Sequence, residues 1–294
     1  MMKKMVNAWR KSESFYNFKT NPLAIMGAGL LAFFMLMAIV GPFLTPQDPY
    51  NLKELSLDNS FRPPVWLDGE ARFALGTDQQ GRDLLSGIVY GVRISMFVGV
   101  SATILSLLLG TFFGIIAGYR GGWVDSLIMR IADVQLSFPS MLIALFIMVA
   151  FGRGIEKLIL ALTLVGWVTY ARTVRGSTLA ERNKEYVEAA RVCGFPAWVI
   201  MFRHILPNVL TPLIVIATIQ VGNFILTEAT LSFLGVGVPI TKPSLGLLLS
   251  NGYQVLFSGL WWVSVFPGIA LLMMVVGVNL LGDFLRDELN PRLK

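Results

Sequence analysis

Long apolar runs separated by short polar segments dominate this chain. The first run, Leu23 to Leu44, carries no charge over 22 residues, and the second, Ile94 to Tyr119, carries none over 26. About 20 apolar residues in a helix are enough to cross the hydrocarbon core of a bilayer. Four further apolar runs follow, at residues 134–152, 158–171, 205–233 and 260–282. The pattern therefore predicts an all-α polytopic membrane protein with six transmembrane helices.

Small residues and prolines refine this prediction. Glycines recur about one helical turn apart in the second run, which lets a neighbouring helix approach closely in lipid; they are Gly99, Gly110, Gly114 and Gly118. Pro139 lies inside the third run and predicts a kink there. The run at 158–171 has only 14 residues, so its helix is either short or draws on its flanks. Residues 235–259 are rich in Gly and Pro and apolar enough to dip back into the membrane.

Composition supports the membrane assignment. Hydrophobic residues make up 55% of the 294 and charged residues only 14%, whereas soluble domains carry roughly 25% charge. The mean hydropathy is +0.66. A single cysteine, Cys193, excludes an internal disulfide. With one Cys and one His, no metal site built from these side chains is expected.

The charge distribution predicts the orientation and the domain boundaries. Six spans place both termini on one side, and that side carries 16 of the 24 Lys and Arg residues, which marks it as cytoplasmic. The basic, aromatic start of the chain suits a helix on the bilayer surface better than a nucleic-acid-binding arm. The predicted segments are a cytoplasmic N-terminal part at 1–22, a first helix at 23–44, an extracytoplasmic loop at 45–93, a five-helix core at 94–282 with a cytoplasmic loop at 172–208, and a cytoplasmic tail at 283–294.

A polar stretch at residues 186–208 interrupts the apolar pattern. Residues 186–192 favour a short helix, and Gly194 followed by Pro196 predicts its end. A second helix is expected from Pro196 to Leu206, ended by Pro207. Charge spacing within the first helix would allow Glu188 to pair with Lys184 or Arg191. The small side chains in this stretch would let another protein approach, so it is either a docking site for a soluble partner or an ordinary cytoplasmic loop.

A second polar motif ends the long loop. It reads LGTDQQGRD over residues 75–83, and its glycines permit tight bends while its charged side chains can pair locally. The candidate residues are Gly76, Thr77, Asp78, Gly81, Arg82 and Asp83. They favour a structural clasp that holds the loop onto the second span, with substrate contact as the weaker alternative.

One acidic residue, Glu228, lies inside the fifth apolar run. A carboxylate at membrane depth is costly, so it should face a partner helix or water. It could line or gate a pathway and attract an amino group. Equally, it could accept a hydrogen bond from Thr227, Thr230 or Asn223. Both interpretations stay open.

No catalytic constellation is found in the sequence. It contains no G-x-S-x-G, no H-E-x-x-H and no Walker-type phosphate-binding motif, so no catalytic residue is assigned and no ATP hydrolysis is expected from this chain. His204, the single histidine, lies beside the entrance of the fifth span and is expected to be an interfacial residue.

Several stretches resemble the permease subunits of bacterial ABC importers for dipeptides, oligopeptides and nickel, in particular the second, "C-type" permease. Residues 188–190 (EAA), Gly194 and residues 206–207 (LP) resemble the EAA loop of this family, with His204 as a departure. Residues 75–83 resemble its LGTDxxGRD signature, and residues 282–291 resemble its ending, with departures at Phe284 and Asn290. Residues 242–246 (KPSLG) differ from the family's usual segment in the outer loop.

The resemblance implies a type I importer permease fold. It also implies that the EAA loop forms a coupling helix seated on an ATPase. The residues that this assigns to coupling are Tyr186, Glu188, Ala189, Ala190, Arg191, Gly194, Leu206 and Pro207. The implied partners are a homologous second permease, two ATP-binding subunits that hold ATP and magnesium, an extracytoplasmic solute-binding protein and the lipid bilayer of the inner membrane, and no nucleic acid.

The implied function is ATP-driven import of peptides, with this chain forming half of the pathway. The same architecture could import nickel or a metal chelate. A proton-coupled secondary transporter, with Glu228 as the proton relay, and an intramembrane enzyme are the rival classes. The absence of paired acid and base residues in the sequence argues against the enzyme.

Overall fold

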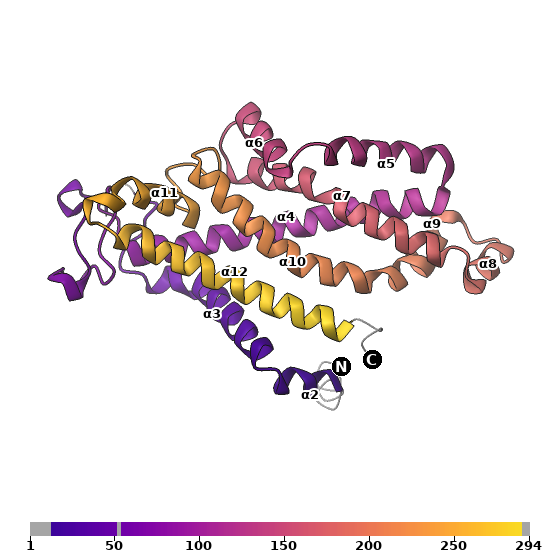
Figure 1. Ribbon diagram of the computed structural model, residues 1–294, viewed down its shortest axis with the longest axis horizontal. Coiled ribbons are helices and arrows are strands. Elements are labelled where there is room, and N and C mark those ends of the chain that lie inside the picture. Colours follow the sequence, from indigo (N-terminus) through magenta and orange to yellow (C-terminus); the bar gives the residue numbers. More distant parts are fainter. Residues whose placement is uncertain (1–12, 52–53, 290–294) are drawn as a thin grey trace. The chain divides into compact units, whose positions relative to one another are not determined.

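The structure is a computed structural model that describes residues 13–51 and 54–289 (Figure 1). Within these residues every regular element is a helix, and the one extended feature is a single bridge between Thr77 and Asp83. The all-α prediction is confirmed. The chain divides into two compact units: unit 1 comprises residues 1–97 and 225–294, and unit 2 comprises residues 98–224.

Among the described residues, five helical stretches are long and apolar enough to cross a membrane. They are α3 (Pro22–Leu44), α4 (Leu84–Arg120), α7 (Ile155–Glu181), the continuous stretch Ala197–Phe233 and α12 (Trp262–Leu289). The pair α5 (Gly122–Leu136) and α6 (Ser140–Phe151) makes a sixth if it is counted as one broken span. With α5 and α6 counted as one span, the total is six, as the sequence pattern predicts.

Pro139 marks a sharper break than the kink expected from the sequence. Helix α5 ends at Leu136, Pro139 is the N-cap residue of α6, and the two helices are bent by 88°. Proline lacks a backbone N–H and disfavours helical geometry at the residue before it. The third apolar run therefore contains parts of two helices. The segment with charged residues that precedes it, 120–133, lies mostly in α5.

Helix boundaries extend past the apolar runs. Helix α4 begins at Leu84, well before the expected end of the loop at residue 93, and α12 continues to Leu289, past the expected start of the tail. Helix α7 draws on both flanks, as expected, and is 27 residues long. Helix α2 (Glu13–Thr20) lies within the predicted N-terminal segment, of which residues 1–12 fall outside the described residues.

Unit 1 is built on α12. Helix α3 and the short helix α11 (Leu245–Val255) both pack against it. Helix α2 is attached to its far end, where Phe18 meets Phe284 edge-on with ring centroids 5.4 Å apart. The described part of the unit also contains the 3₁₀ turns η2 (Leu57–Asn59), η3 (Val65–Leu67) and η5 (Leu256–Ser258).

Unit 2 is built on close packing of α4 against α7. A Cβ atom added to Gly110 would lie 2.4 Å from the Trp167 carbonyl oxygen, and one added to Gly114 would lie 2.5 Å from that of Ala171. Only glycine permits this approach, so the predicted role of the α4 glycines is confirmed at both positions. Helix α5 is joined to α7 by the Asp125–Arg175 ion pair.

The polar interruption of unit 2 contains α8 (Glu185–Val192), α9 (Ala197–Val199), the π-helical turn η4 (Ile200–Ile205) and the start of α10 (Leu206–Phe233). Pro207 does not end a helix, contrary to the expectation, because it is the second residue of α10. A proline normally clashes with the carbonyl four residues before it, here that of Arg203. Arg203 lies in the wider π turn, which accommodates the proline within one continuous helix.

Candidate functional site

The α8–α9 loop, defined as residues 184–199, is a short helix followed by a tight bend. The Gly194 N–H donates to the Arg191 carbonyl oxygen at 3.0 Å, and the Phe195 N–H donates to that of Ala190 at 3.1 Å. Gly194 has a φ of +77°. These two bonds and the left-handed glycine form a Schellman motif, which closes the C-terminus of α8. The predicted helix and its stop at Gly194 are confirmed.

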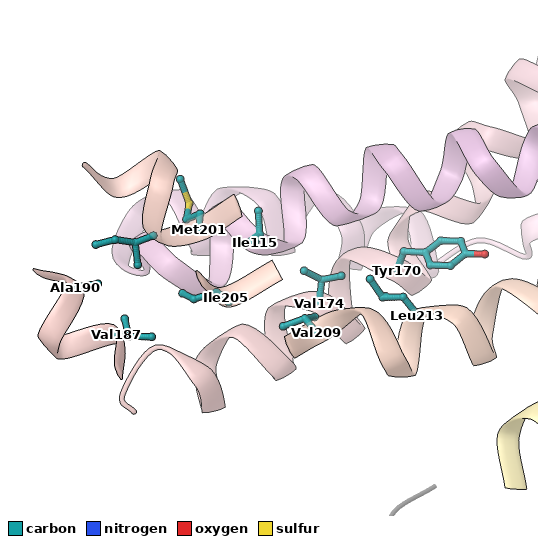
Figure 2. Packing of buried hydrophobic residues seen from close by; sticks show 10 residues of the cluster. Ile115, Tyr170, Val174, Val187, Ala190, Met201, Ile205, Val209 and Leu213 are labelled. Atoms are coloured by element: carbon teal, nitrogen blue, oxygen red, sulfur yellow. The ribbon is translucent and has the colours of Figure 1, made fainter. Parts of the chain in front are cut away.

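One face of α8 is buried in a hydrophobic cluster of unit 2 (Figure 2). Val187 is fully buried and Ala190 is 5% exposed. The other buried members come from α4, α7, η4 and α10: Ile115, Tyr170, Val174, Ile200, Met201, Ile205, Val209 and Leu213. A densely packed cluster transmits displacement instead of absorbing it. Helix α8 therefore shares one packed cluster with the three long helices α4, α7 and α10.

Hydrogen bonds of Tyr186 and Lys184 hold the start of α8 in place. The Tyr186 hydroxyl donates to Glu181 Oε2 at 2.7 Å and accepts from Asn208 Nδ2 at 3.0 Å. Lys184 Nζ donates to Glu181 Oε1 at 2.6 Å, so it pairs with this acid and not with Glu188 as expected. Burial, reinforced by the bond to Glu181, raises the pKa of the Tyr186 hydroxyl, which keeps it protonated and able to donate.

The other end of α8 is held through Arg191. Its guanidinium lies 5.4 Å from the centre of the Tyr119 ring, and its Nη2 donates to the Arg182 carbonyl oxygen at 3.4 Å. Arg182 in turn donates to the Gly118 carbonyl oxygen at 2.9 Å. The expected pair of Arg191 with Glu188 is replaced by these contacts, and Glu188 belongs to none of the ion pairs among the described residues.

The opposite side of the loop is exposed and largely apolar. We call it the docking face; it comprises Glu188, Ala189, Val192, Phe195 and Trp198. Val192 is 89% exposed and Trp198 is 66% exposed. Large apolar side chains that are exposed together on one segment are typical of a protein interaction site.

The eight residues assigned to coupling from the sequence fall into three groups. Glu188, Ala189 and Gly194 are exposed on the bend or the docking face, and Ala190 is buried in the cluster. The remaining residues support the loop from its ends: Tyr186, Arg191, Leu206 and Pro207. The sequence motif thus combines exposed residues with residues that hold the loop in place.

The second motif lies in a segment of unit 1 that we call the clasp, residues 56–86. Thr77 sits at its centre: its hydroxyl donates to the Asn59 carbonyl oxygen at 2.5 Å and accepts from the Arg62 N–H at 2.8 Å. Asp78 Oδ1 accepts from the backbone N–H groups of Gln80 at 2.8 Å and Arg82 at 3.0 Å. These bonds fold the motif onto the preceding loop.

Asp83 connects the clasp to the start of α4. Its carboxylate accepts from both the backbone N–H and the hydroxyl of Ser86, at 2.8 and 2.5 Å. Its own N–H donates to Gln47 Oε1 at 2.6 Å. Gly81 has a φ of +72°, and a Cβ there would lie 2.1 Å from the Ser56 carbonyl oxygen. The turn therefore requires glycine.

The charged residues of the clasp are buried. Asp78 and Asp83 are each 1% exposed and Arg82 is 2% exposed. Burial raises the pKa of both carboxyls and lowers that of the Arg82 guanidinium, while their hydrogen bonds and mutual attraction act in the opposite direction. Buried, internally bonded side chains hold a loop together and present little to a solute, which supports the clasp interpretation.

Glu228 is fully buried in α10. Ser95 Oγ donates to its Oε2 at 2.5 Å, and Ser232 Oγ donates to its Oε1 at 2.8 Å. The sequence suggested other donors, but Thr230 instead donates to the Leu226 carbonyl oxygen at 2.7 Å. A role for Glu228 in a pathway stays a prediction.

Among the described residues, no group of three or more His, Cys, Asp or Glu side chains lies in an arrangement that could hold a metal ion. His204 Nδ1 lies 3.3 Å from the Val199 carbonyl oxygen, and its ring is 5.5 Å from that of Phe195. These are local contacts of the α8–α9 loop and its support.

Several residues that anchor the α8–α9 loop or contact Glu228 belong to no recognisable sequence motif. Val187, Ile200 and Ile205 anchor the α8–α9 loop, yet they read as ordinary apolar residues. Ser95 donates to Glu228 from a distant part of the chain, so no local spacing could reveal it. A helical period of buried positions in α8 would have indicated Val187, because it stands three residues before the buried Ala190.

Comparison with known proteins places this geometry in a family. Residues 110–294 match the model of the binding-protein-dependent transport system inner membrane component, and residues 7–64 match that of the N-terminal transmembrane domain of oligopeptide transport permease C. The dipeptide transport system permease protein DppC of Escherichia coli K12 is 43% identical over 283 residues, which cover 96% of this chain and 93% of that protein.

Two relatives from Bacillus subtilis are similar over nearly the whole chain. Its DppC is 38% identical over 98% of this chain and 86% of its own length, and its oligopeptide transport system permease protein OppC is 37% identical over 99% and 92%. A chain of the MetNI methionine ABC transporter, solved in an inward-facing conformation, has the same fold, with a TM-score of 0.55 and 21% identity, and covers 69% of this chain and 96% of its own length. The chain therefore belongs to the family of inner membrane components of binding-protein-dependent transport systems, the permeases of bacterial ABC importers.

Proposed function

We propose that this chain is a permease subunit of an ATP-driven importer of dipeptides or oligopeptides and that it forms half of the translocation pathway. Relatives at 37–43% identity over nearly the full length are permeases of dipeptide and oligopeptide systems. None of the relatives named above is a nickel permease, so peptide is the cargo we favour over nickel or a metal chelate.

Coupling to a separate ATPase goes through the α8–α9 loop. The observation that carries this proposal is the two-sided character of α8: Val192, on the docking face, is 89% exposed, while Val187 is fully buried in the cluster. An ATPase seated on the exposed side would move α8 when it closes on ATP. The packed side would pass that movement to α4, α7 and α10.

The partners follow from the same reasoning. The chain has no phosphate-binding motif, so two ATP-binding subunits would hold ATP and magnesium. A second, homologous permease would complete the pathway, and an extracytoplasmic solute-binding protein would deliver the cargo. We place the complex in the bacterial inner membrane, with both termini and the α8–α9 loop in the cytoplasm, because most Lys and Arg lie on that side.

The direct test is uptake of radiolabelled dialanine by proteoliposomes that contain the whole transporter with its binding protein. Wild-type complexes should take up the peptide only when ATP is inside the vesicle with the ATPase. Val192→Asp should abolish most uptake, because a buried unpaired charge at an interface costs several kcal/mol. The matched control is Leu57→Asp, at a site in η2 that is 77% exposed, and it should leave uptake unchanged.

Two outcomes would overturn the proposal. Accumulation of radioactive nickel in place of dialanine would contradict the peptide cargo. Uptake that is driven by a proton gradient, is insensitive to vanadate and needs no ATPase would favour a secondary transporter.

A further inference from the structure

The 3₁₀ turn η3 presents three consecutive large apolar side chains at the surface of unit 1. Val65, Trp66 and Leu67 are 42%, 56% and 41% exposed. Single exposed apolar residues are ordinary on a protein surface, but several together on one segment mark an interaction surface. The sequence motif of the clasp begins only at residue 75, so it does not account for this patch.

The backbone around η3 is held by its own hydrogen bonds. The N–H groups of Leu67 and Gly69 donate to the Pro64 carbonyl oxygen at 2.8 and 3.2 Å. A Cβ atom on Gly69 would lie 2.0 Å from the Pro63 carbonyl oxygen, so the turn that follows η3 requires glycine. Phe73, a few residues further on, is buried. The apolar patch is therefore presented by an ordered turn with a buried anchor behind it.

Helix α12 places η3 relative to the bilayer. The Trp66 ring meets the Phe266 ring edge-on, with centroids 5.8 Å apart. Residues 262–282 carry no charge and lie in α12. As a helix they measure about 30 Å, which matches the hydrocarbon core of a bilayer. Phe266 lies only about one turn, roughly 6 Å, inside the start of α12. Trp66 therefore contacts α12 near the boundary between the hydrocarbon and the headgroups.

A second tryptophan marks the same level. Trp261 is exposed, and its ring lies 5.8 Å from that of Phe266 and 6.1 Å from that of Trp262. Tryptophan is enriched where membrane meets water because its ring is apolar while its indole N–H needs a polar partner. Phe266 thus lies beside one tryptophan from the clasp and one from the start of a membrane span.

The exposed apolar surface continues from this point along α12. Ile269 and Met273 follow Phe266 by one and two turns on the same face of the helix, and both are exposed. In the opposite direction along the chain from the patch, η3 is followed at once by exposed charged residues, Asp68, Glu70 and Arg72. A segment with an apolar tip, next to a membrane-spanning face and flanked by charges, is typical of the bilayer interface.

We propose that η3 is an interfacial anchor, in which Val65, Trp66 and Leu67 insert into the headgroup boundary of the leaflet that meets the start of α12. The anchor holds the clasp on the membrane surface. Its partner is the phospholipid bilayer, whose ester and headgroup oxygens can accept from the Trp66 indole N–H. A soluble partner is disfavoured because Phe266 lies within the apolar segment of α12. The inference requires that α12 crosses the membrane and does not depend on the cargo or on coupling to an ATPase.

The experiment measures the depth of η3 in the assembled transporter, reconstituted without the binding protein into vesicles of phosphatidylethanolamine and phosphatidylglycerol. A nitroxide spin label is attached to Leu67→Cys in a chain that carries Cys193→Ser, with partner subunits free of reactive cysteine. Its collisions with oxygen, which concentrates in lipid, and with a water-soluble nickel chelate are measured by electron paramagnetic resonance. Val65→Cys is a second label site should Leu67→Cys fail to assemble.

Two reference sites calibrate the depth. Leu57→Cys, in η2 of the same segment, reports water, and Phe33→Cys, an exposed site in the middle of α3, reports hydrocarbon. The ratio of oxygen to chelate collisions at Leu67→Cys should exceed that at Leu57→Cys at least about threefold and fall below that at Phe33→Cys.

Variants of Trp66 test its part in the anchor. Trp66→Glu should lower the ratio at Leu67→Cys to that of the water reference, because a charge is costly at the boundary of the hydrocarbon. Trp66→Phe, which keeps an aromatic ring against Phe266, should retain most of the ratio. The melting temperature of the complex should stay unchanged in both variants because Trp66 is more than half exposed.

Three results would overturn the inference. A label at Leu67→Cys that meets the chelate as often as the label at Leu57→Cys would place η3 in water. A label shielded from both oxygen and the chelate would show that a protein subunit covers η3. An intermediate depth that stays the same in Trp66→Glu would remove the anchoring role of Trp66. Because none of these measurements uses a transported solute, a wrong peptide assignment would leave them unaffected.

Discussion

The α8–α9 loop and the clasp are both polar segments between long apolar helices, and each carries a recognisable motif. They differ in whether the motif residues are buried or exposed. In the clasp Thr77, Asp78 and Asp83 are at most 1% exposed and bond to their own segment and its neighbours. In the α8–α9 loop, Glu188 and Ala189 lie on the surface, and the anchoring residues beneath them are plain hydrophobics.

The difference shows that a sequence signature does not by itself distinguish a surface from a scaffold. Charged motif residues can form the interior of a loop when glycines allow tight bends and backbone N–H groups donate hydrogen bonds to the carboxylates. Small motif residues can form the exposed surface of a loop when larger apolar residues beneath them anchor it. Burial decides between the two, and it leads to opposite expectations for mutation.

The largest effect is expected in the clasp. Asp78→Ala removes two hydrogen bonds and leaves Arg82 buried without its nearby carboxylate, which should destabilise the chain by about 3 kcal/mol or more. We expect a large loss of folded transporter, measured by the yield and the melting temperature of the purified complex. The control is Asp58→Ala, an exposed acid of the same segment. Equal melting temperatures for the two variants would contradict the scaffold role.

A pair of tryptophans sharpens the comparison. Trp198 on the docking face is 66% exposed and Trp66 in the clasp is 56% exposed. Trp198→Ala should weaken binding of the ATPase by about 2 kcal/mol, roughly 30-fold, because buried tryptophans are frequent interface hot spots. Trp66→Ala should leave that affinity unchanged. Titration of detergent-solubilised permease complex with ATPase subunits measures both, and a similar loss in the two variants would remove the distinction.

The bend of the α8–α9 loop offers a smaller effect of a different origin. At Gly194 a Cβ would meet open space, so only the φ of +77° restricts the residue. Gly194→Val should cost about 1–2 kcal/mol and reduce uptake per ATP hydrolysed, whereas Gly194→Asn, which tolerates this conformation, should retain most coupling. Normal coupling in the valine variant would show that the bend is not needed.

The smallest effect is a pH dependence confined to the clasp. The pKa values of Asp78 and Asp83 are raised above the ordinary 3.8 by burial, so protonation favours the folded state. Their contribution to stability is complete below that ordinary value and is lost as the pH rises through the folded-state pKa. Asp83→Asn should therefore flatten the acidic part of a plot of melting temperature against pH. An unchanged slope would contradict the assignment.

Local signals predicted the elements of the α8–α9 loop well. The end of α8 at Gly194 follows from backbone chemistry that acts within a few residues, and the close packing of α4 follows from its glycine spacing. Pro207 was misjudged because relief by a π turn depends on how the whole helix packs. At Pro139 the sequence predicts a bend, but the angle of 88° between α5 and α6 depends on what each helix packs against.

Long-range partners were beyond the sequence. Lys184 had two acids within helical reach, and the choice of Glu181 depends on where α7 ends relative to α8. The two serines that donate to Glu228 are at positions 95 and 232, and only the folded unit 1 brings Ser95 beside it. Conversely, the charges of the clasp were expected to pair with one another, but Asp78 and Asp83 bond mainly to backbone groups and hydroxyls.

Cys193 allows the most direct test of the claim that the α8–α9 loop docks a separate ATPase. It is the single cysteine of the chain, and it is exposed next to the docking face. A photoactivatable thiol cross-linker attached to Cys193 in the assembled transporter should give a product with an ATP-binding subunit, and Trp198→Ala should reduce its yield. Failure to form that product, together with labelling of Cys193 by an impermeant reagent from outside intact cells, would contradict the account.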